Sequence, residues 1–336
     1  MTRFAFLTTT AMSLFCFSSE SKAGVDLASG AFALPDTTSS EGWESLDFDE
    51  PFDTPPVVIV SPGASPGGQP FTVKVKDIGT TGFTLQTWEP VGAGNPAWHL
   101  DVEGTYFAMK PGVYNLPGGI QVVVGTIDTA AVQADTERVS GVVPTWETAT
   151  FAVDFDEPPV VLTTIQTANN ERGITPATDH SAPWMVAAVD NITESGFDVA
   201  LDKGQVDDID DEDTPEVETI VPETIGYVAM TRNAYGTLVD SLGDQVNYEA
   251  IFEVIPEDQR WGIDNPQWCL DLLNDYDTTP PAVASLNARN HSDGGWVQIT
   301  KLTKDEICVR CNEDQYWDGE RIRWGGTFGY LILEPG

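Results

Sequence analysis

Short apolar runs recur along this chain between glycine- and proline-rich stretches, and no segment after residue 23 keeps a helical period with caps. The run Val57-Val-Ile-Val follows two prolines, and comparable runs begin at Val160 and Ala282. Proline cannot donate to a β-ladder and suits the start or the edge of a strand, whereas consecutive Val and Ile residues suit a buried strand. The pattern therefore predicts a strand at each of these three places.

These strands belong to a set of landmarks that occurs three times in the same order. The first landmark reads Phe52-Asp-Thr-Pro-Pro-Val, then Phe155-Asp-Glu-Pro-Pro-Val, then Tyr276-Asp-Thr-Thr-Pro-Pro-Ala. The second reads Thr80-Thr-Gly-Phe, then Glu194-Ser-Gly-Phe, and more weakly Lys304-Asp-Glu-Ile. The third reads Tyr106-Phe-Ala-Met, then Tyr227-Val-Ala-Met, then Tyr330-Leu-Ile-Leu. We expect three related domains in tandem, at 24–129, 130–242 and 243–336.

The second landmark marks a tight turn inside a hairpin. Val73–Asp77 and Met185–Asp190 lead into the first two turns, where glycine supplies the conformation that lets the next strand begin. Short strands, Gly/Pro turns and domain-sized repeats predict an all-β protein of three tandem antiparallel β-sandwich domains.

The N-terminus, 1–23, has the pattern of a secretory signal peptide. Arg3 precedes an apolar run from Phe4 to Phe17, and Ser21-Lys-Ala offers a cleavage site before Gly24. The run is too short to span a bilayer, and the alternative is a buried first helix. We expect a secreted protein without membrane insertion, located in the periplasm, at the cell surface or outside the cell.

Composition sets the class of partner. Asp and Glu number 53 against 16 Lys and Arg, a formal net charge of −37, which disfavours nucleic acid and anionic membranes. Hydrophobic residues still make up 41% of the chain, enough for packed cores rather than a disordered acidic tail.

The order of the landmarks resembles that of the H-type lectin domain, best over roughly Trp43–Met109, recognisably in the second copy and weakly in the third. The resemblance implies a compact six-stranded antiparallel sandwich, often trimeric or hexameric, that binds terminal sugars such as N-acetylgalactosamine at subunit edges. It also places Trp88 near the binding-loop aromatics of that family, and it makes a homo-oligomer an expectation.

The loop Trp88-Glu-Pro-Val-Gly-Ala-Gly-Asn-Pro-Ala-Trp-His is the best candidate for a carbohydrate site. Trp88 and Trp98 would stack on the apolar face of a pyranose. Glu89, Asn95 and His99 would bond its hydroxyl groups. The alternative is that both tryptophans fill the core or an inter-domain seam. The polar segments 169–172 and 287–291 are further candidates.

Three cysteines follow the signal segment. In the strand-like Glu306-Ile-Cys-Val-Arg-Cys the two cysteines would lie roughly 10 Å apart, too far for a mutual disulfide. Cys269 is therefore expected to form a disulfide with either Cys308 or Cys311. A zinc site is the less favoured interpretation of the three cysteines, because it would need a fourth ligand.

The acidic run Asp207-Asp-Ile-Asp-Asp-Glu-Asp is the densest charge in the chain. Calcium is the cofactor this run would take, through Asp207, Asp208, Asp210 and Asp211. The alternative is a solvated acidic insertion with no ion.

The chain carries none of the common catalytic motifs, and its three histidines, His99, His180 and His291, do not share a position in the repeat. We therefore expect no enzyme. The sequence favours a non-catalytic protein that binds glycans or polysaccharide in adhesion or surface attachment. The alternative is a structural surface or assembly protein with no sugar ligand. Exposed Trp88 and Trp98 would favour the first, and their burial the second.

Overall fold

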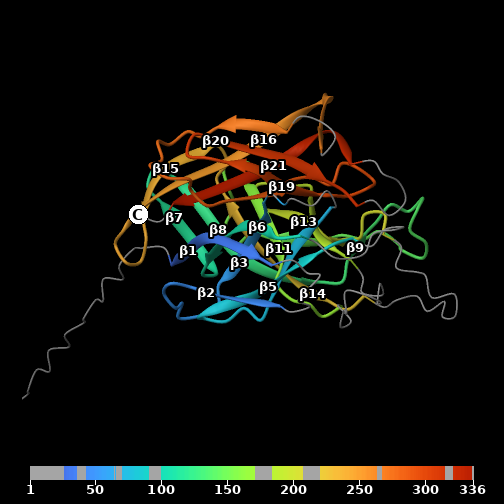
Figure 1. Cartoon of the computed structure of the whole chain (residues 1–336), viewed down its shortest axis with the longest axis horizontal. Coiled ribbons are helices and arrows are strands. Elements are labelled where there is room, and N and C mark those ends of the chain that lie inside the picture. The colour runs from blue at the N-terminus through green and yellow to red at the C-terminus, as the bar shows by residue number, and fades with distance from the viewer. Residues whose placement is uncertain are drawn as a thin grey trace, which may run out of the picture.

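The computed structural model describes residues 26–35, 43–63, 65, 70–90, 100–170, 184–206, 220–262, 267–314 and 321–334. In this part of the chain every regular element is a β-strand, and every strand pairing is antiparallel except that of β9 with β13 (Figure 1). The prediction of an all-β fold is confirmed. No helix capable of crossing a membrane occurs among these residues. The expected signal segment, 1–23, lies outside them.

The strands form six sheets, two from each third of the chain, which we define as residues 26–110, 112–231 and 234–334. In the first third, one sheet has the strand order β1 (Leu27–Leu34), β6 (Val102–Met109), β3 (Val57–Pro62). The other sheet has the order β2 (Glu44–Asp47), β5 (Gly82–Trp88), β4 (Thr72–Lys76). In the middle third, one sheet has the strand order β11 (Val160–Ile165), β14 (Glu223–Met230), β8 (Ile120–Thr129), β7 (Gly112–Leu116). The other sheet has the order β10 (Glu147–Thr150), β13 (Gly196–Asp202), β12 (Val186–Asp190), and β9 (Val132–Gln133) pairs with β13. In the last third, one sheet has the strand order β15 (Ala234–Val239), β16 (Gln245–Gly262), β21 (Ile322–Glu334), β18 (Ala282–Leu286). The other sheet has the order β17 (Trp268–Asp271), β20 (Glu306–Asn312), β19 (Trp296–Leu302).

The landmarks fall on strands as predicted. The Pro-Pro segments lead into β3, β11 and β18, and the predicted hairpins are β4–β5 and β12–β13. The sheets place β7 and β8, which precede the expected boundary at 129/130, beside β14 of the middle third.

Each third encloses an apolar core between its two sheets, and the first two cores contain the same arrangement of four rings. The Phe48 and Phe52 centroids are 5.0 Å apart at 76°, and those of Phe151 and Phe155 are 5.2 Å apart at 77°. The other two rings of each set, Phe83 with Tyr106 and Phe197 with Tyr227, meet edge to face at 5.4 and 5.2 Å. Three rings of each set belong to the repeated landmarks, and the fourth, Phe48 or Phe151, precedes the first landmark, so the repeat produces the same packing in two places.

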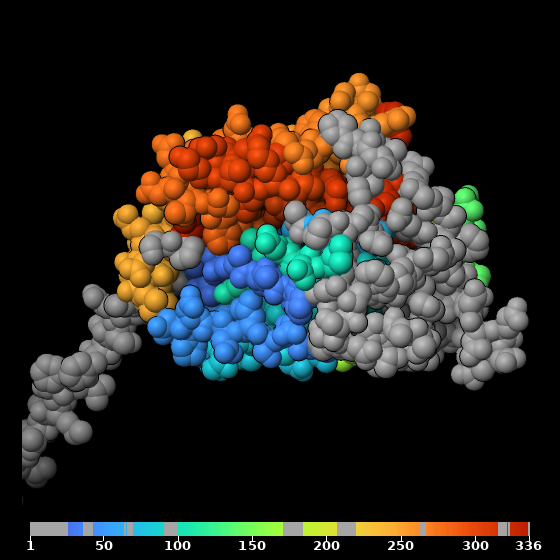
Figure 2. Space-filling model, in the orientation of Figure 1, coloured from blue at the N-terminus to red at the C-terminus, as the bar shows by residue number. Residues whose placement is uncertain are grey.

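A fourth core lies where the sheets that contain β3, β11 and β18 meet. It includes Ile59 of β3, Leu162 of β11 and Leu331 of β21, all almost fully buried. Strand β3 is buried on both faces, because Val57 and Ile59 enter this central core while Val58 and Val60 enter the core of their own third. This explains an apolar run without polar alternation. The last third, orange to red, forms the upper half of the view in Figures 1 and 2.

The strands β3, β11 and β18 are edge strands of their sheets, and side chains of the neighbouring third cover each edge. The Val60 N–H donates to Thr164 Oγ1 (3.2 Å) and the Thr163 N–H to Ser285 Oγ (3.3 Å). The Ala284 N–H donates to Ser61 Oγ (2.7 Å), which closes the cycle. Unpaired edges invite association with other chains. Here three edges cover one another around a common axis.

Amide side chains extend this cycle. Gln166 accepts a hydrogen bond from the Val58 N–H (2.9 Å) and donates one to the Val58 carbonyl oxygen (2.7 Å). Asn287 does the same for Val161, at 3.2 and 2.6 Å. Each amide thus satisfies both polar groups of a buried backbone unit that has no strand partner on that side.

Candidate functional site: the aromatic seam

Trp88, the best candidate of the sequence, lies where the three thirds of the chain converge. It is 5% exposed and packs with Trp184, Val186, Val206 and Trp296, a cluster that we call the aromatic seam. The Trp184 and Trp296 centroids are 5.0 Å apart. The seam joins residues of the first, middle and last thirds.

Strand alternation explains how Trp88 reaches the seam. On β5, Phe83 and Leu85 point into the core of the first third, so Trp88 points to the opposite face. There the ammonium group of Lys74 lies 4.7 Å from the centroid of the Trp88 ring. Trp296 is held by a hydrogen bond of 2.7 Å from its Nε1 to the Phe71 carbonyl oxygen. This hydrogen bond links the last third of the chain directly to the first.

Trp88, which was expected to form part of a sugar platform, is 5% exposed. It belongs to one buried cluster with Trp184 and Trp296, as the alternative of an inter-domain seam expects. Glu89, expected to bond sugar hydroxyls, is also buried, and burial raises its pKa to about 8 against the opposing effect of Arg321. Its carboxyl group is thus not presented to solvent. The other three candidates, Asn95, Trp98 and His99, lie outside the described residues.

A buried polar network continues the seam between the middle and last thirds. Arg289 Nε donates to Asp202 Oδ2 at 2.9 Å, and the two side chains are 9% and 1% exposed. Gln205 Nε2 bridges Asp135 (3.2 Å) and Asp293 (3.0 Å). Paired and hydrogen-bonded in this way, charged groups can be kept from water.

Glu313 is the most unusual member of this network. It is 3% exposed, and its Oε1 has no hydrogen-bond partner among the described residues. Burial raises its pKa to about 8, opposed mainly by Arg323 and His291. Arg323 is fully buried and donates to the Gly294 carbonyl oxygen (2.6 Å) and to Asn290 (2.5 Å). Glu313 follows the last residue of β20 just as Glu89 follows the last residue of β5.

His291 and Asp293 are the members of this network that reach the surface, with side chains 34% and 26% exposed. The His291 Nδ1 lies 3.1 Å from Asp293 Oδ2. The contact raises the pKa of His291 and lowers that of Asp293. The loop 287–291, a further candidate of the sequence, contributes Asn287 to the edge of β11 and Arg289 to the buried polar network. Asn169 and Asn170 bond Glu223 and its neighbours, while 171–172 lie outside the described residues.

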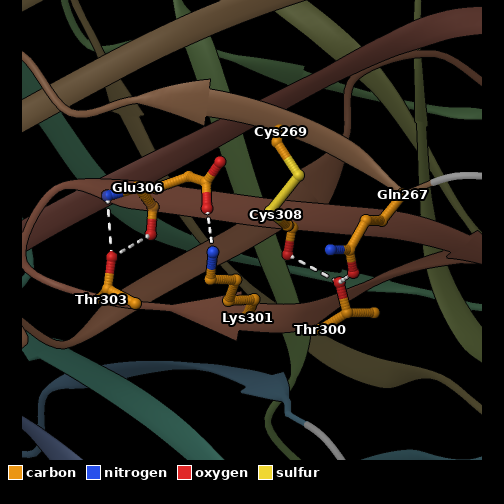
Figure 3. The surroundings of a disulfide bond; sticks show 7 residues. All are labelled: Gln267, Cys269, Thr300, Lys301, Thr303, Glu306 and Cys308. Carbon is orange, nitrogen blue, oxygen red and sulfur yellow. Dashed lines mark hydrogen bonds and ion pairs between the residues drawn. A yellow bond between two sulfur atoms is a disulfide. The ribbon is translucent and has the colours of Figure 1, made fainter.

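The disulfide joins Cys269 of β17 to Cys308 of β20, one of the two pairings that the sequence left open (Figure 3). The two residues are directly opposite in the ladder. Cys311 is a free, buried thiol on the other face of β20, and burial raises its pKa to about 12. Glu306 lies close to both bonded sulfurs, but it pairs with Lys301, and the disulfide leaves no thiolate for a metal ion. The four expected calcium ligands, in 207–211, lie outside the described residues.

Sequence reasoning missed Trp184, Trp296 and Glu313 as members of the site. A usable signal existed for the first two. Trp184 lies just before β12 and Trp296 begins β19, and these are the strands that pair with the repeated Gly-Phe and Glu-Ile strands. Nothing in the sequence distinguishes Glu313 from the other 52 acidic residues.

Comparison of the chain with protein-family models, with curated proteins and with solved structures finds no match. The resemblance to the H-type lectin domain stays a prediction.

Proposed function

We propose that this protein is a non-catalytic structural component of an exported surface or assembly, built from three copies of one β-sandwich unit locked into a single body. The observation that carries the proposal is the burial of Trp88 against Trp184 and Trp296. The aromatic residue best placed for recognition is used to hold the three thirds together.

Three further features support this role. The central core, the cycle of edge-strand hydrogen bonds and the polar network around Gln205 each link thirds of the chain that are distant in sequence. The first two also bury strand edges and sheet faces that an isolated sandwich would expose to solvent. A chain whose three thirds are packed together in this way suits a role as a rigid structural spacer.

Carbohydrate binding is the second candidate, and Trp324 favours it. Trp324 is 44% exposed, and the guanidinium carbon of Arg260 lies 4.0 Å from the centroid of its ring. One face is covered by Arg260, so the exposed area belongs to the remainder of the ring. An exposed indole on a paired strand can stack on a pyranose.

A glycan array and thermal unfolding, applied to the same variants, separate the two candidates. For the structural role we expect no glycan signal from the folded protein, one unfolding transition, and a lower midpoint for Trp88→Ala. A glycan signal that disappears in Trp88→Ala at an unchanged midpoint would contradict it. A signal that disappears only in Trp324→Ala would establish the second candidate instead.

A further inference from the structure

The sheets that contain β3, β11 and β18 follow one plan, and the first third leaves one position of this plan without a strand. The order is β11, β14, β8, β7 in the middle third and β18, β21, β16, β15 in the last. In the first third it is β3, β6, β1, and no strand in the described part of the chain pairs with the outer edge of β1. Strand β1 therefore takes the place of β8 and β16 but lacks a counterpart of β7 or β15, which lie on the same side of the molecule in Figure 1.

The strand registers support this correspondence. Leu27 of β1 lies opposite Met109, the last residue of the third landmark. In the second copy of this landmark Met230 lies opposite Val122 of β8, and in the third copy the equivalent residue of β16 is Tyr248. On their other side, Val122 pairs with β7 and Tyr248 with β15. The side of Leu27 that corresponds to these pairings is the outer edge of β1.

The backbone of β1 has unpaired polar groups along this edge. The Lys110 N–H donates to the Asp26 carbonyl oxygen at 3.1 Å, so Asp26 bonds toward β6. Successive residues of an antiparallel strand bond alternately to one side and to the other. Ala28 therefore bonds β6, whereas the N–H and carbonyl groups of Leu27 and Ser29 point away from it. No hydrogen bond to these four groups occurs within the described part of the chain.

Strand β1 lacks the features that usually keep an edge strand from pairing. Exposed edges in natural proteins are short, or they carry lysine, proline or a bulge. The eight residues of β1, Leu-Ala-Ser-Gly-Ala-Phe-Ala-Leu, include no charged residue and no proline, although 21% of the chain is charged. Its ladder with β6 runs without a register shift, and it is longer than β7 or β15. Such an edge can accept an added strand through main-chain hydrogen bonds.

The strands β7 and β15 indicate which side chains an added strand would carry. Tyr114 and Leu116 of β7 pack against the central core, and Ala234 and Leu238 of β15 belong to it. Leu27 also packs against this core and is only partly buried. A strand beside β1 would direct every second side chain to the same core, so these side chains should be apolar.

The charge of the chain decides between two sources of such a strand. Two copies with a formal net charge of −37 repel each other, whereas a segment flanked by Lys or Arg is attracted. We propose that the outer edge of β1 binds an extended segment of another protein, antiparallel to β1 as β7 is to β8, with alternate apolar residues and basic flanks. The proposal goes beyond the structural role, since it requires only the open edge of β1.

A synthetic peptide with the β15 sequence Ala-Tyr-Gly-Thr-Leu-Val and two lysines at each end is the probe. Its binding to the full chain, measured by fluorescence anisotropy of a labelled peptide, should be saturable. The Asp240 N–H donates to the Asp244 carbonyl oxygen just beyond the ladder of β15 with β16. The same alternation makes Gly236 bond β16 while Thr237 faces away. N-methylation of the peptide at this glycine should therefore weaken binding by ~10-fold or more, and at this threonine should leave it unchanged.

Ser29→Pro tests the protein side of the contact. It removes an outward N–H of β1 and no bond to β6, and it should weaken peptide binding by ~10-fold or more. Ser29→Ala is the matched control, because it keeps the N–H and loses only the bond from Ser29 Oγ to the Leu333 carbonyl oxygen (2.8 Å). It should bind the peptide like the parent protein, and circular dichroism shows whether each variant is folded. A peptide with glutamates in place of the lysines should bind more weakly at low salt.

Absence of saturable binding, equal binding of the two methylated peptides, or unchanged binding to folded Ser29→Pro would overturn the proposal. A parent protein that dimerises in sedimentation experiments, and a Ser29→Pro variant that does not, would assign the edge to a second copy instead. Where Ser29→Pro does not fold, the two methylated peptides decide. None of these results bears on the burial of Trp88, so the structural role stands or fails separately.

Discussion

Gly329 of β21 lies directly against Val160 of β11, and a β-carbon at Gly329 would occupy the space of a Val160 methyl group. The two residues belong to the last and middle thirds, and Val160 is fully buried in the central core. The absence of a side chain at Gly329 is thus a condition for the two sheets to approach each other.

Gly329→Ala should therefore destabilise the whole chain. Overpacking of a close-packed core costs about 1–3 kcal/mol, and we expect a loss of about that size in the free energy of unfolding. Urea denaturation followed by tryptophan fluorescence measures it. Gly79→Ala is the control, since a β-carbon there would meet no atom closer than 3.7 Å. Equal midpoints for the two variants would show that the middle and last thirds do not pack as described.

Gln166→Ala should cost about 2–3 kcal/mol, because the Val58 N–H and carbonyl would both lose their partner inside the protein. Chemical denaturation of this variant and of Gln245→Ala, an exposed position at the start of β16, gives the comparison. A loss confined to one of two separate transitions would contradict the idea that the edges lock all three thirds into one body.

Stability should fall as the pH rises from about 4.5 to about 8. The pKa of Glu313 is raised to about 8 in the folded chain, mainly by burial, from an ordinary value of 4.5. In this window the folded chain keeps a proton on Glu313 that the unfolded chain has released, so a higher pH favours unfolding. Glu89 acts in the same direction.

Glu313→Gln mimics the protonated form and should flatten this dependence. The expected result is a smaller fall of the unfolding midpoint between pH 6 and pH 8 than in the parent protein, measured by thermal scans in matched buffers. Glu257→Gln, at an exposed position, should keep the parent slope. A parent midpoint that does not change between pH 6 and pH 8 would refute the buried, protonated state of Glu313.

The thiol of Cys311 should resist alkylation until the chain unfolds. It is 1% exposed and burial raises its pKa to about 12, so little of the reactive thiolate forms at neutral pH. Iodoacetamide labelling with mass spectrometry, in buffer and in denaturant, tests this. Cys308→Ala, which opens the disulfide, should show labelling of Cys269 under native conditions, because Cys269 lies on an exposed strand position.

Much of the local structure could be predicted from the sequence. The Pro-Pro segments, the Gly-Phe turns and the Tyr-x-x-Met strands specify secondary structure through properties of the residues themselves: a missing donor, a permissive glycine, an apolar strand face. The strands β3, β5, β6 and their counterparts lie where these rules place them. The repeated four-ring packing follows as well, because the same residues occupy the same register in the first two thirds.

What covers each face of a sheet was decided only by the tertiary structure. Strand alternation indicates that Trp88 points away from the core of its own third, but it cannot say whether that face meets water or another part of the chain. Trp184 and Trp296, far along the chain, join Trp88 in one buried cluster, and Gln166 bonds the edge of β3. Hydrophobic burial and hydrogen-bond satisfaction depend on which groups meet in space, and a local sequence pattern does not specify contacts with distant parts of the chain.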